Sequence, residues 1–305
     1  MITGANGFIG RHCLPFLLAS GAEVHAVTSR LPAESESAGI HWHQADLLNE
    51  AETQVLIAKI KPSHLLLLAW YVEPGQFWTS PENLRWVQAS LSLLQAFAQH
   101  GGERVIMAGT CAEYDWRYGY CSEAVTPLLP KTLYATSKHA LHLILDSFAQ
   151  QANLSAAWGR VFFLYGPYEH PNRLVSSVIR SLLRGESARC SHGNQQRDFL
   201  HVEDVASAFV ALFNSEVRGA VNIASGKPVT LQTIIHKIAT TLHQENLVQF
   251  GAIPVPADDP PLLVGDVRRL TSEVGWSPRY DLDQGLADTI HWWQDQLANT
   301  AQEKQ

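Results

Sequence analysis

Hydrophobic and polar positions follow two kinds of periodic pattern through the first half of the chain. Short apolar runs typical of buried strands occupy residues 23–28, 40–44, 64–69, 104–108 and 155–163. Between them, apolar side chains recur at helical spacing in residues 50–61, 84–100 and 133–152. Strands and helices of these lengths form crossovers around a parallel sheet that is covered on both faces. The pattern therefore predicts an α/β fold with a doubly wound parallel sheet.

The rhythm changes after Gly166 and Pro167. Helical spacing now appears at residues 174–184, 205–214, 230–244 and 282–298, separated by short strands and a proline-rich turn at 254–261. We expect a nucleotide-binding domain over residues 1–166 and a smaller, mixed α/β lobe over residues 167–305 that mainly binds substrate. Some of the later segments are expected to pack with the first domain.

Composition narrows the choice of partners. The 305 residues are 46% hydrophobic and carry a net charge of −7, which argues against nucleic acid and against anionic membrane surfaces. No apolar run is long enough to span a bilayer, and the first residues do not resemble a secretory signal. The four cysteines lack CxxC spacing. These features predict a cytoplasmic protein with reduced thiols, no metal site and no membrane partner.

A glycine-rich loop directly follows the first residues. It reads Gly4-Ala-Asn-Gly7-Phe-Ile-Gly10 and precedes a helical stretch that extends to about residue 20. Glycines at this spacing permit a tight turn, close approach of a pyrophosphate and close helix–strand packing, and the helix N-terminus attracts phosphate. The loop predicts a dinucleotide site in a Rossmann-type fold. Its expected cofactor-binding residues are Gly4, Asn6, Gly7, Phe8, Ile9 and Gly10.

The strand before this loop is very short. Either it consists of residues 1–3 alone, or the natural start of the protein lies upstream of Met1. Both possibilities stay open from the sequence.

The end of the second strand bears on the choice of cofactor. An acidic residue there would bind the ribose 2′-hydroxyl of NAD, but the chain has Ser29 and Arg30. A guanidinium beside a hydroxyl suits a 2′-phosphate, so NADP is favoured over NAD. The alternative is that Arg30 is a solvated loop residue. Asp46 and Leu47 are expected to meet the adenine, although Asp46 could equally cap the next helix.

Tyr134 and Lys138 are the strongest catalytic candidates. They are four residues apart in a predicted helix, so both side chains project from one face. A nearby ammonium, together with an oxidised nicotinamide, would stabilise the phenolate and make Tyr134 an effective proton donor and acceptor. Thr110 follows the strand at 104–108, at the sheet edge where such folds bind ligands, and can orient a substrate oxygen.

With these motifs the chain resembles the extended short-chain dehydrogenases/reductases, the NAD-dependent epimerase/dehydratase family. The resemblance also rests on Leu68-Ala69, on Arg197-Asp-Phe199 and on Gly275-Trp-Ser-Pro278. It implies a Thr110–Tyr134–Lys138 triad, Leu68 and Ala69 beside the cofactor, and a nucleotide-diphosphate sugar as substrate, held between the two lobes. It also implies a homodimer formed through the helices at 84–100 and 133–152.

The chain departs from this family at the substrate. Cys111 and Ala112 stand where sugar-nucleotide dehydratases have Asp and Glu, and Glu113 is expected to point elsewhere, so dehydration is disfavoured. Phe163 replaces a usual Asn, and Pro256 replaces a diphosphate-binding Arg. We hypothesise that Arg173 and Arg197 jointly bind the diphosphate. The expected substrate-binding residues are Thr110, Phe163, Arg173, Leu174 and Arg197.

Aromatic residues and histidines leave less specific signals. Trp70, Trp78 and Trp86 either wall the substrate pocket or form an ordinary core cluster. The histidines lack apparent metal-ligating neighbours and are expected to be structural.

Three functions remain from the sequence. The leading hypothesis is NADPH-dependent reduction of a keto-sugar nucleotide, in which Tyr134 delivers the proton. The alternative is a C4 epimerase that retains its cofactor. A less favoured third is a non-catalytic sensor or scaffold, which the intact triad argues against.

Overall fold

A seven-stranded parallel sheet forms the centre of the protein. The computed structural model describes residues 1–32 and 39–302. The strand order is β11-β7-β5-β4-β1-β2-β3, and neighbouring strands are parallel throughout. The strands are β1 (Ile2–Thr3), β2 (Val24–Thr28), β3 (Ile40–Gln44), β4 (His64–Leu67), β5 (Arg104–Thr110), β7 (Ser155–Val161) and β11 (Gly219–Ile223). This arrangement confirms the predicted Rossmann-type fold.

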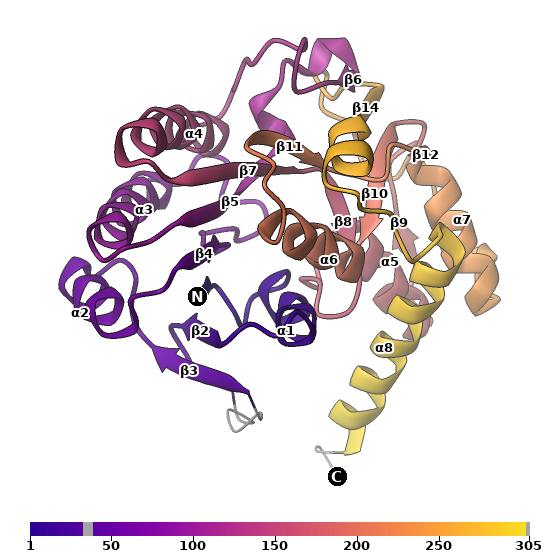
Figure 1. Cartoon of the computed structure of the whole chain (residues 1–305). Coiled ribbons are helices and arrows are strands. Elements are labelled where there is room, and N and C mark those ends of the chain that lie inside the picture. Colours follow the sequence, from indigo (N-terminus) through magenta and orange to yellow (C-terminus); the bar gives the residue numbers. More distant parts are fainter. Residues whose placement is uncertain (33–38, 303–305) are drawn as a thin grey trace.

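Helices cover both faces of this sheet (Figure 1). On one face lie α1 (Gly10–Ala19) and α6 (Val202–Phe213), and on the other α2 (Glu50–Ile60), α3 (Glu82–Gln99) and α4 (Leu133–Ala152). Each face has its own apolar core, because the strand side chains alternate between the two. The cap of α2 is Asn49, whose side chain accepts from the amides of Ala51 and Glu52. The alternative that Asp46 caps this helix is therefore wrong.

A smaller mixed lobe lies beside the sheet. Its helices are α5 (Leu174–Leu183), α7 (Leu231–Leu242) and α8 (Leu282–Gln302), which share a separate apolar core. Its five-stranded sheet contains β6 (Tyr120–Cys121), β8 (Phe163–Tyr165), β10 (Gln196–His201), β12 (Pro228–Thr230) and β14 (Leu262–Gly265), and β9 (Ala188–Arg189) pairs with β13 (Val248–Gln249). Although α6 and β11 come late in the chain, they pack against α1 and β7 of the larger sheet.

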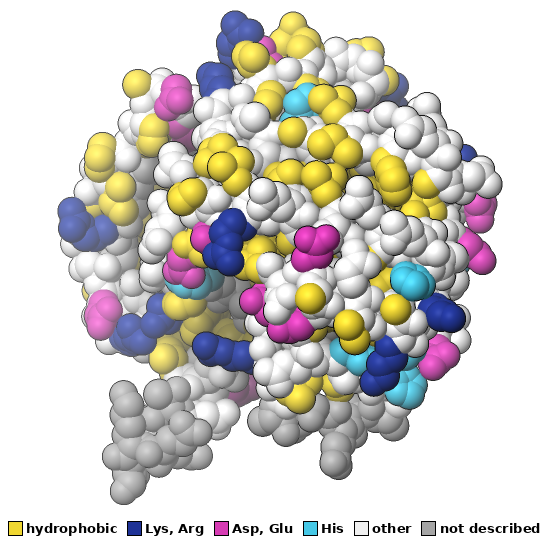
Figure 2. Space-filling model, turned by 90° about the vertical axis from the view of Figure 1, so that its left-hand side faces the viewer, with side chains coloured by type: hydrophobic (Ala, Val, Ile, Leu, Met, Phe, Trp, Pro, Cys, Tyr) yellow, Lys and Arg dark blue, Asp and Glu magenta, His cyan; other side chains and the backbone are white. Residues whose placement is uncertain are grey.

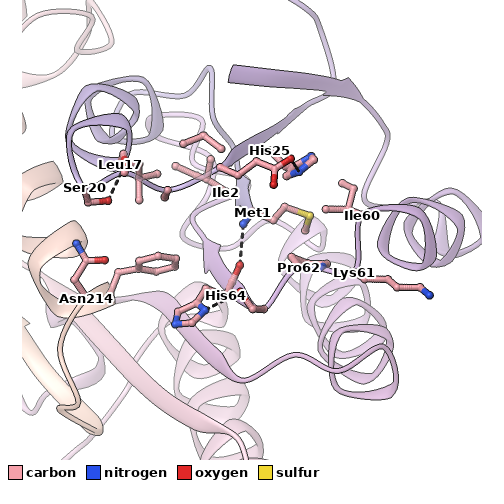
Figure 3. Close-up of a pocket in the computed structure, with 16 residues that line it drawn as sticks. Met1, Ile2, Leu17, Ser20, His25, Ile60, Lys61, Pro62, His64 and Asn214 are labelled. Carbon is pink, nitrogen blue, oxygen red and sulfur yellow. Dashed lines mark hydrogen bonds and ion pairs between the residues drawn. The ribbon is translucent and has the colours of Figure 1, made fainter. Parts of the chain in front are cut away.

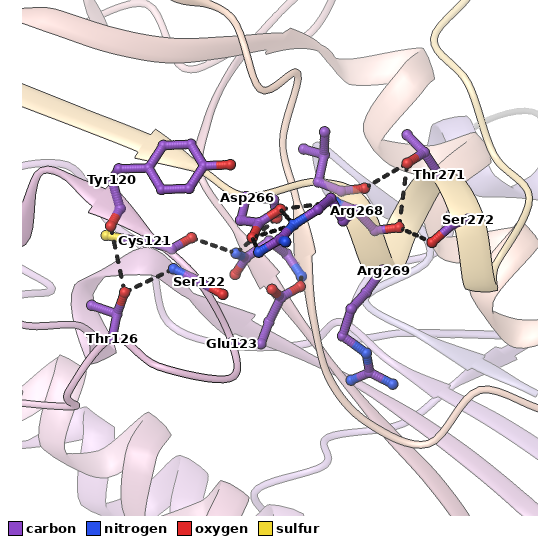
Figure 4. Close-up of polar contacts among 12 residues, drawn as sticks. Tyr120, Cys121, Ser122, Glu123, Thr126, Asp266, Arg268, Arg269, Thr271 and Ser272 are labelled. Carbon is purple, nitrogen blue, oxygen red and sulfur yellow. Dashed lines mark hydrogen bonds and ion pairs between the residues drawn. The ribbon is translucent and has the colours of Figure 1, made fainter.

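Hydrogen bonds join β11 to two segments of the small lobe, residues 120–126 and 266–272, which Figure 4 shows. The Asn222 side chain donates to the carbonyls of Cys121 (2.9 Å) and Asp266 (3.1 Å). Its backbone N–H donates to the Glu123 carboxylate at 2.7 Å. Asn222 is fully buried, so these bonds replace the water it loses on folding. The hydrogen bonds fix the position of the second sheet relative to the first.

Among the described residues, no helix combines the length and the apolar character that a membrane crossing requires.

Candidate active site

The glycine loop makes backbone contacts that only glycine allows. A Cβ atom on Gly10 would lie 2.1 Å from the Gly4 carbonyl oxygen, and Gly4 itself has a φ of +64°. A Cβ on Gly4 would stand 3.0 Å from the backbone of Ala69, which follows β4. The loop is therefore pressed against both the start of α1 and the end of β4, as a dinucleotide-binding loop requires.

Free backbone donors lie in the same loop. No side chain caps α1 at Ile9, and the amides of Phe8 and Ile9 find no acceptor in the described part of the chain. Arg11 adds a positive charge there, and its guanidinium donates to the Asn6 carbonyl (2.6 Å) and side chain (3.1 Å). Uncapped amides at a helix N-terminus bind phosphate oxygens. The residues present thus fit a dinucleotide.

The residues expected around the adenosine lie at the same edge of the sheet. Ser29 and Arg30 are exposed just beyond β2, and the Arg30 backbone amide donates to the Thr28 hydroxyl at 3.3 Å. Asp46 is exposed beyond β3, whereas Leu47 is buried. Leu68 is half-buried and Ala69 buried beyond β4. No described side chain pairs with the Arg30 guanidinium, so its charge is available to a ligand.

Thr110, Tyr134 and Lys138 come together where β5 ends and α4 begins. All three are at least nine-tenths buried. Thr132 caps α4, and the Tyr134 amide donates to the Trp78 carbonyl at 3.1 Å. The Tyr134 ring meets the edges of Phe77 (4.8 Å between centroids) and Trp78 (5.7 Å). The phenol is thereby held in one orientation inside an aromatic wall.

Lys138 is held separately from the phenol. Its ammonium donates to the Ala108 carbonyl at 2.9 Å and lies 3.7 Å from the centre of the Trp70 ring. Burial lowers the pKa of Lys138 to about 7, and the Glu113 carboxylate opposes this shift. The Ala108 carbonyl and the Trp70 ring are the groups that contact the ammonium in this buried position.

The pKa of Tyr134 is raised from its ordinary value by burial. A hydrogen bond with Thr110 lowers it, Cys111 and Glu113 raise it further, and the charge of Arg173 has the smallest effect, in the lowering direction. The sequence predicts that the Lys138 ammonium stabilises the phenolate, but Lys138 is not among the groups that shift this pKa. Whether a bound cofactor brings that stabilisation stays a prediction.

Glu113 is the most important residue that sequence reasoning underestimated. Its carboxylate accepts from the Thr110 amide (2.9 Å), the Trp158 indole (2.8 Å) and the Arg160 guanidinium (3.0 Å). Glu113 is fully buried, so its charge is balanced inside the protein by Arg160. Its side chain thus points towards Trp158 and Arg160 of β7, in line with the expectation that it points elsewhere. It ties the turn that carries Thr110 to β7.

The two arginines expected at the diphosphate lie in different surroundings. Arg173 is exposed at the start of α5, with its guanidinium 5.4 Å from the Phe77 ring. Arg197 is buried on β10, bonded to Asp259 at 2.6 Å and 5.6 Å from the Phe163 ring. Leu174 is half-buried beside Arg173. The placement associates Arg173 with the tyrosine and Arg197 with Phe163 and Cys111.

The tryptophans combine both roles that the sequence left open. Trp70 faces Lys138 and donates from its indole to Asn83 at 2.9 Å, and Trp78 faces Tyr134. Trp86 lies 6.3 Å from Trp70 and packs against the core beneath it. The first two thus wall the catalytic pair, and the third supports the wall.

One acid–histidine group also lies behind the site. Glu113, His139 and His142 bring potential ligand atoms within 4.8 Å of one another. The spacing of the two histidines in the sequence does not reveal this cluster. However, the Arg160 guanidinium lies 3.3 Å from His142 and is paired with Glu113. A cation in this position would meet that charge, so we assign the group to packing.

The chain is similar to known proteins in both sequence and structure. The model of the NAD dependent epimerase/dehydratase family matches residues 1–224. UDP-glucuronic acid decarboxylase 1 of Xenopus tropicalis is 26% identical, over 99% of this chain and 73% of its own length. UDP-glucuronate 4-epimerase of Thermodesulfobacterium geofontis is 21% identical, over 97% and 96%. MoeE5, solved with NAD and either UDP-glucuronic acid or UDP-glucose, is 32% identical, covers 97% of this chain and 98% of its own, and superposes with a TM-score of 0.85.

Proposed function

Because the chain belongs to the NAD dependent epimerase/dehydratase family, we propose that it oxidises and re-reduces C4 of a nucleotide-linked sugar. The reaction that the site supports best is C4 epimerisation of a UDP-linked hexuronic acid. One observation carries this proposal: Thr110, Tyr134 and Lys138 lie together, and the Arg173 guanidinium lies over the Phe77 ring that packs against Tyr134.

The substrates of the relatives agree with a cation at this position. UDP-glucuronic acid is named for the decarboxylase, for the 4-epimerase and for the MoeE5 complex. Its sugar differs from glucose by a carboxylate, which a guanidinium binds well. Arg173 is exposed and lies over Phe77, the neighbour of Tyr134, whereas Arg197 is buried and paired with Asp259. We therefore assign Arg173 to the sugar and keep Arg197 for the diphosphate.

The chain's residues would act in two half-reactions. When bound, the nicotinamide accepts a hydride from C4 and later returns it. Tyr134, as phenolate, takes the proton of the C4 hydroxyl while that carbon loses its hydride, and Thr110 holds the oxygen. After the keto sugar has turned over in the site, Tyr134 gives the proton back as the hydride reaches the opposite face. Lys138 binds the nicotinamide ribose and supplies positive charge.

Two competing reactions are less favoured by the site. Dehydration needs a carboxyl group beside the tyrosine, but Cys111 and Ala112 have none and Glu113 is paired with Arg160. A 4-keto uronic acid loses carbon dioxide when the bond to its carboxylate aligns with the π orbitals of the carbonyl, perpendicular to the carbonyl plane. An arginine that grips the carboxylate opposes this alignment, so Arg173 favours epimerisation over decarboxylation.

Arg30 favours a second candidate, the NADPH-dependent reduction of a keto-sugar nucleotide. Among the described residues its guanidinium has no side-chain partner, and it lies beside Ser29, where the 2′-phosphate of NADP would lie. We propose NADP as the preferred cofactor within a family that uses NAD, and net reduction commonly draws on NADPH. Of the two reactions, only the reduction consumes NADPH. A steady fall in NADPH absorbance therefore distinguishes it from epimerisation.

Product analysis tests the proposal directly. The enzyme is incubated with UDP-glucuronic acid and NAD or NADP, and the products are identified by NMR. Epimerisation gives the C4 epimer with no net change in cofactor. Release of carbon dioxide would replace the proposal by decarboxylation, and no change in any UDP-sugar would reject it. Arg173→Gln should raise KM for UDP-glucuronic acid but leave that for UDP-glucose unchanged, because UDP-glucose has no carboxylate.

We also propose that the chain forms a homodimer through α3 and α4. The face that carries α2, α3 and α4 shows clustered hydrophobic side chains (Figure 2). Leu84, Leu143 and Ile144 are all more than two-fifths exposed there. Light scattering should give twice the chain mass, and Ile144→Glu should give the monomer. A wild-type monomer at micromolar concentration would contradict this.

A further inference from the structure

Three histidines and a glutamate gather on one face of the outer strands β2 and β3. Ile40 and Trp42 of β3 pack into the core that also contains α1, so the alternate side chains of this strand face the other way. His25 of β2 (Figure 3) pairs with His41 of β3 in parallel register, which places both rings on that second face. The group consists of Glu23, His25, His41 and His43.

The Glu23 carboxylate lies next to two of the three imidazoles. Its Oε1 atom is 3.4 Å from Nε2 of His25 and 3.6 Å from Nε2 of His41. Two ligand atoms of a tetrahedral zinc site lie about 3.3 Å apart, because each bond to the metal is about 2.0 Å long. Both separations are close to this value. The rings of His25 and His41 stack at 5.0 Å between centroids, and the His41 side chain is 57% exposed, so its ring is free to turn towards a shared metal.

His43 contacts His25 on the opposite side of its ring. Nε2 of His43 lies 2.9 Å from Nδ1 of His25, and the two ring centroids are 5.2 Å apart. When Nδ1 of His25 donates its hydrogen to His43, Nε2 of His25 carries the lone pair on the side of Glu23. Imidazoles that bind a metal usually donate their other N–H in this way, which fixes the orientation of the ring. His43 is therefore suited to position His25.

The surroundings leave this group open to a cation from solution. The Glu23 side chain is 74% exposed, and among the described residues it pairs with no lysine or arginine. In the acid–histidine group behind the active site, by contrast, an arginine takes that place. Lys59 of α2 adds a positive charge that acts on His43. The Met1 amine acts in the same sense on His25, so the affinity for a cation should be moderate.

We propose that Glu23, His25 and His41 bind Zn²⁺ on the outer strands of the large sheet, with His43 as a positioning residue. Two imidazoles and a carboxylate are ligands that zinc accepts, whereas Mg²⁺ and Ca²⁺ prefer oxygen ligands alone. Water completes the tetrahedral set. The metal joins β2 to the edge strand β3 and thereby stabilises the folded chain. The ligands come from two strands, so the spacing of the histidines in the sequence does not reveal the site.

Titration calorimetry of the whole chain with ZnCl₂ tests this proposal, using protein without a histidine tag that has been treated with EDTA. The wild type should bind one Zn²⁺, and saturating Zn²⁺ should raise its Tm. His43→Val should weaken Zn²⁺ binding by roughly 10–100-fold, as expected for the partner of a ligand. His41→Val removes a ligand and should weaken binding further.

His291→Ala is the matched control, because His291 is an exposed histidine beside an acid, 3.6 Å from Asp295 in α8. This variant should bind Zn²⁺ like the wild type. Thermal unfolding in EDTA shows whether each variant is folded, and Glu23→Gln is a second ligand variant that keeps all three rings. No binding of Zn²⁺ to the wild type, or equal affinities of His41→Val and the wild type, would overturn the proposal. Neither readout depends on catalysis, so the outcome is independent of the assigned reaction.

Discussion

The two edges of the large sheet are built for different purposes. At the C-terminal edge, the glycine loop, Thr110 and the start of α4 bring free backbone donors and buried polar side chains to one place. At the N-terminal edge, polar side chains between β2 and β4, such as His25, Lys61 and His64, are exposed or half-buried (Figure 3). The difference teaches that activity and stability should respond separately to changes at the two edges.

The largest effect is expected at the catalytic edge. Tyr134→Phe removes the proton donor and should lower kcat by roughly 10²–10⁴-fold. Tm should change little, because the ring keeps its contacts with Phe77 and Trp78. Steady-state kinetics and thermal unfolding measure both. Tyr118→Phe, on an exposed tyrosine, is the control. A variant with wild-type turnover would remove Tyr134 from the chemistry.

The buried pair behind Thr110 should come next. Glu113→Ala leaves the Arg160 charge unpaired in the core and should cost about 3–5 kcal/mol in the free energy of unfolding. Replacing both residues by leucine should recover much of this loss, although kcat should stay low because the Thr110 amide loses its acceptor. Urea unfolding of the single and double variants decides. Equal stability of Glu113→Ala and wild type would show that the pair is unimportant.

Cofactor choice should respond more modestly. If Arg30 binds the 2′-phosphate, Arg30→Ala should weaken NADP binding by roughly 10–100-fold, as expected for a charge-assisted hydrogen bond. NAD binding should hardly change, which provides an internal control. Titration calorimetry with both cofactors tests this. An equal loss of affinity for NAD and for NADP would mean that Arg30 does not bind the 2′-phosphate.

The smallest effect is a pH dependence at the opposite edge. The Met1 amine has a pKa near 8 when unfolded, and burial lowers it to about 5. The unfolded chain therefore binds more protons between these values, so stability is present above pH 8 and is lost as pH falls towards 5. The chain acetylated at the Met1 amine should lack this pH dependence. Because His25 and His64 are present in both chains, the difference in Tm against pH isolates the amine, and parallel curves would contradict the assignment.

Local pattern predicted most of the fold. The strand at Ile40–Gln44 and the helix at Leu133–Ala152 have the expected bounds. Their signals, hydrophobic periodicity and a cap such as Thr132, depend only on residues close together in the sequence. The alternative that Asp46 caps α2 was wrong, because Asp and Asn suit this role equally and only the turn geometry selects Asn49.

The parts of the site that depend on contacts between residues far apart in the sequence could not be predicted from local patterns. Glycine spacing and the separation of Tyr134 from Lys138 carry local information. By contrast, Glu113 meets Arg160 across 47 positions, and Phe77 reaches Tyr134 from another element. A charged residue three positions after a buried strand is the local sign that the sequence offers for Glu113. Whether the assigned residues bind cofactor and substrate stays a prediction.

The most direct test of the central claim follows the hydride itself. UDP-glucuronic acid labelled with deuterium at C4 is converted by the enzyme with unlabelled cofactor in ordinary water, and the product is examined by NMR and mass spectrometry. If C4 is oxidised and re-reduced in one site, the C4 epimer keeps its deuterium, and Tyr134→Phe forms almost none. Loss of the label to water, or no turnover of this substrate, would contradict the account.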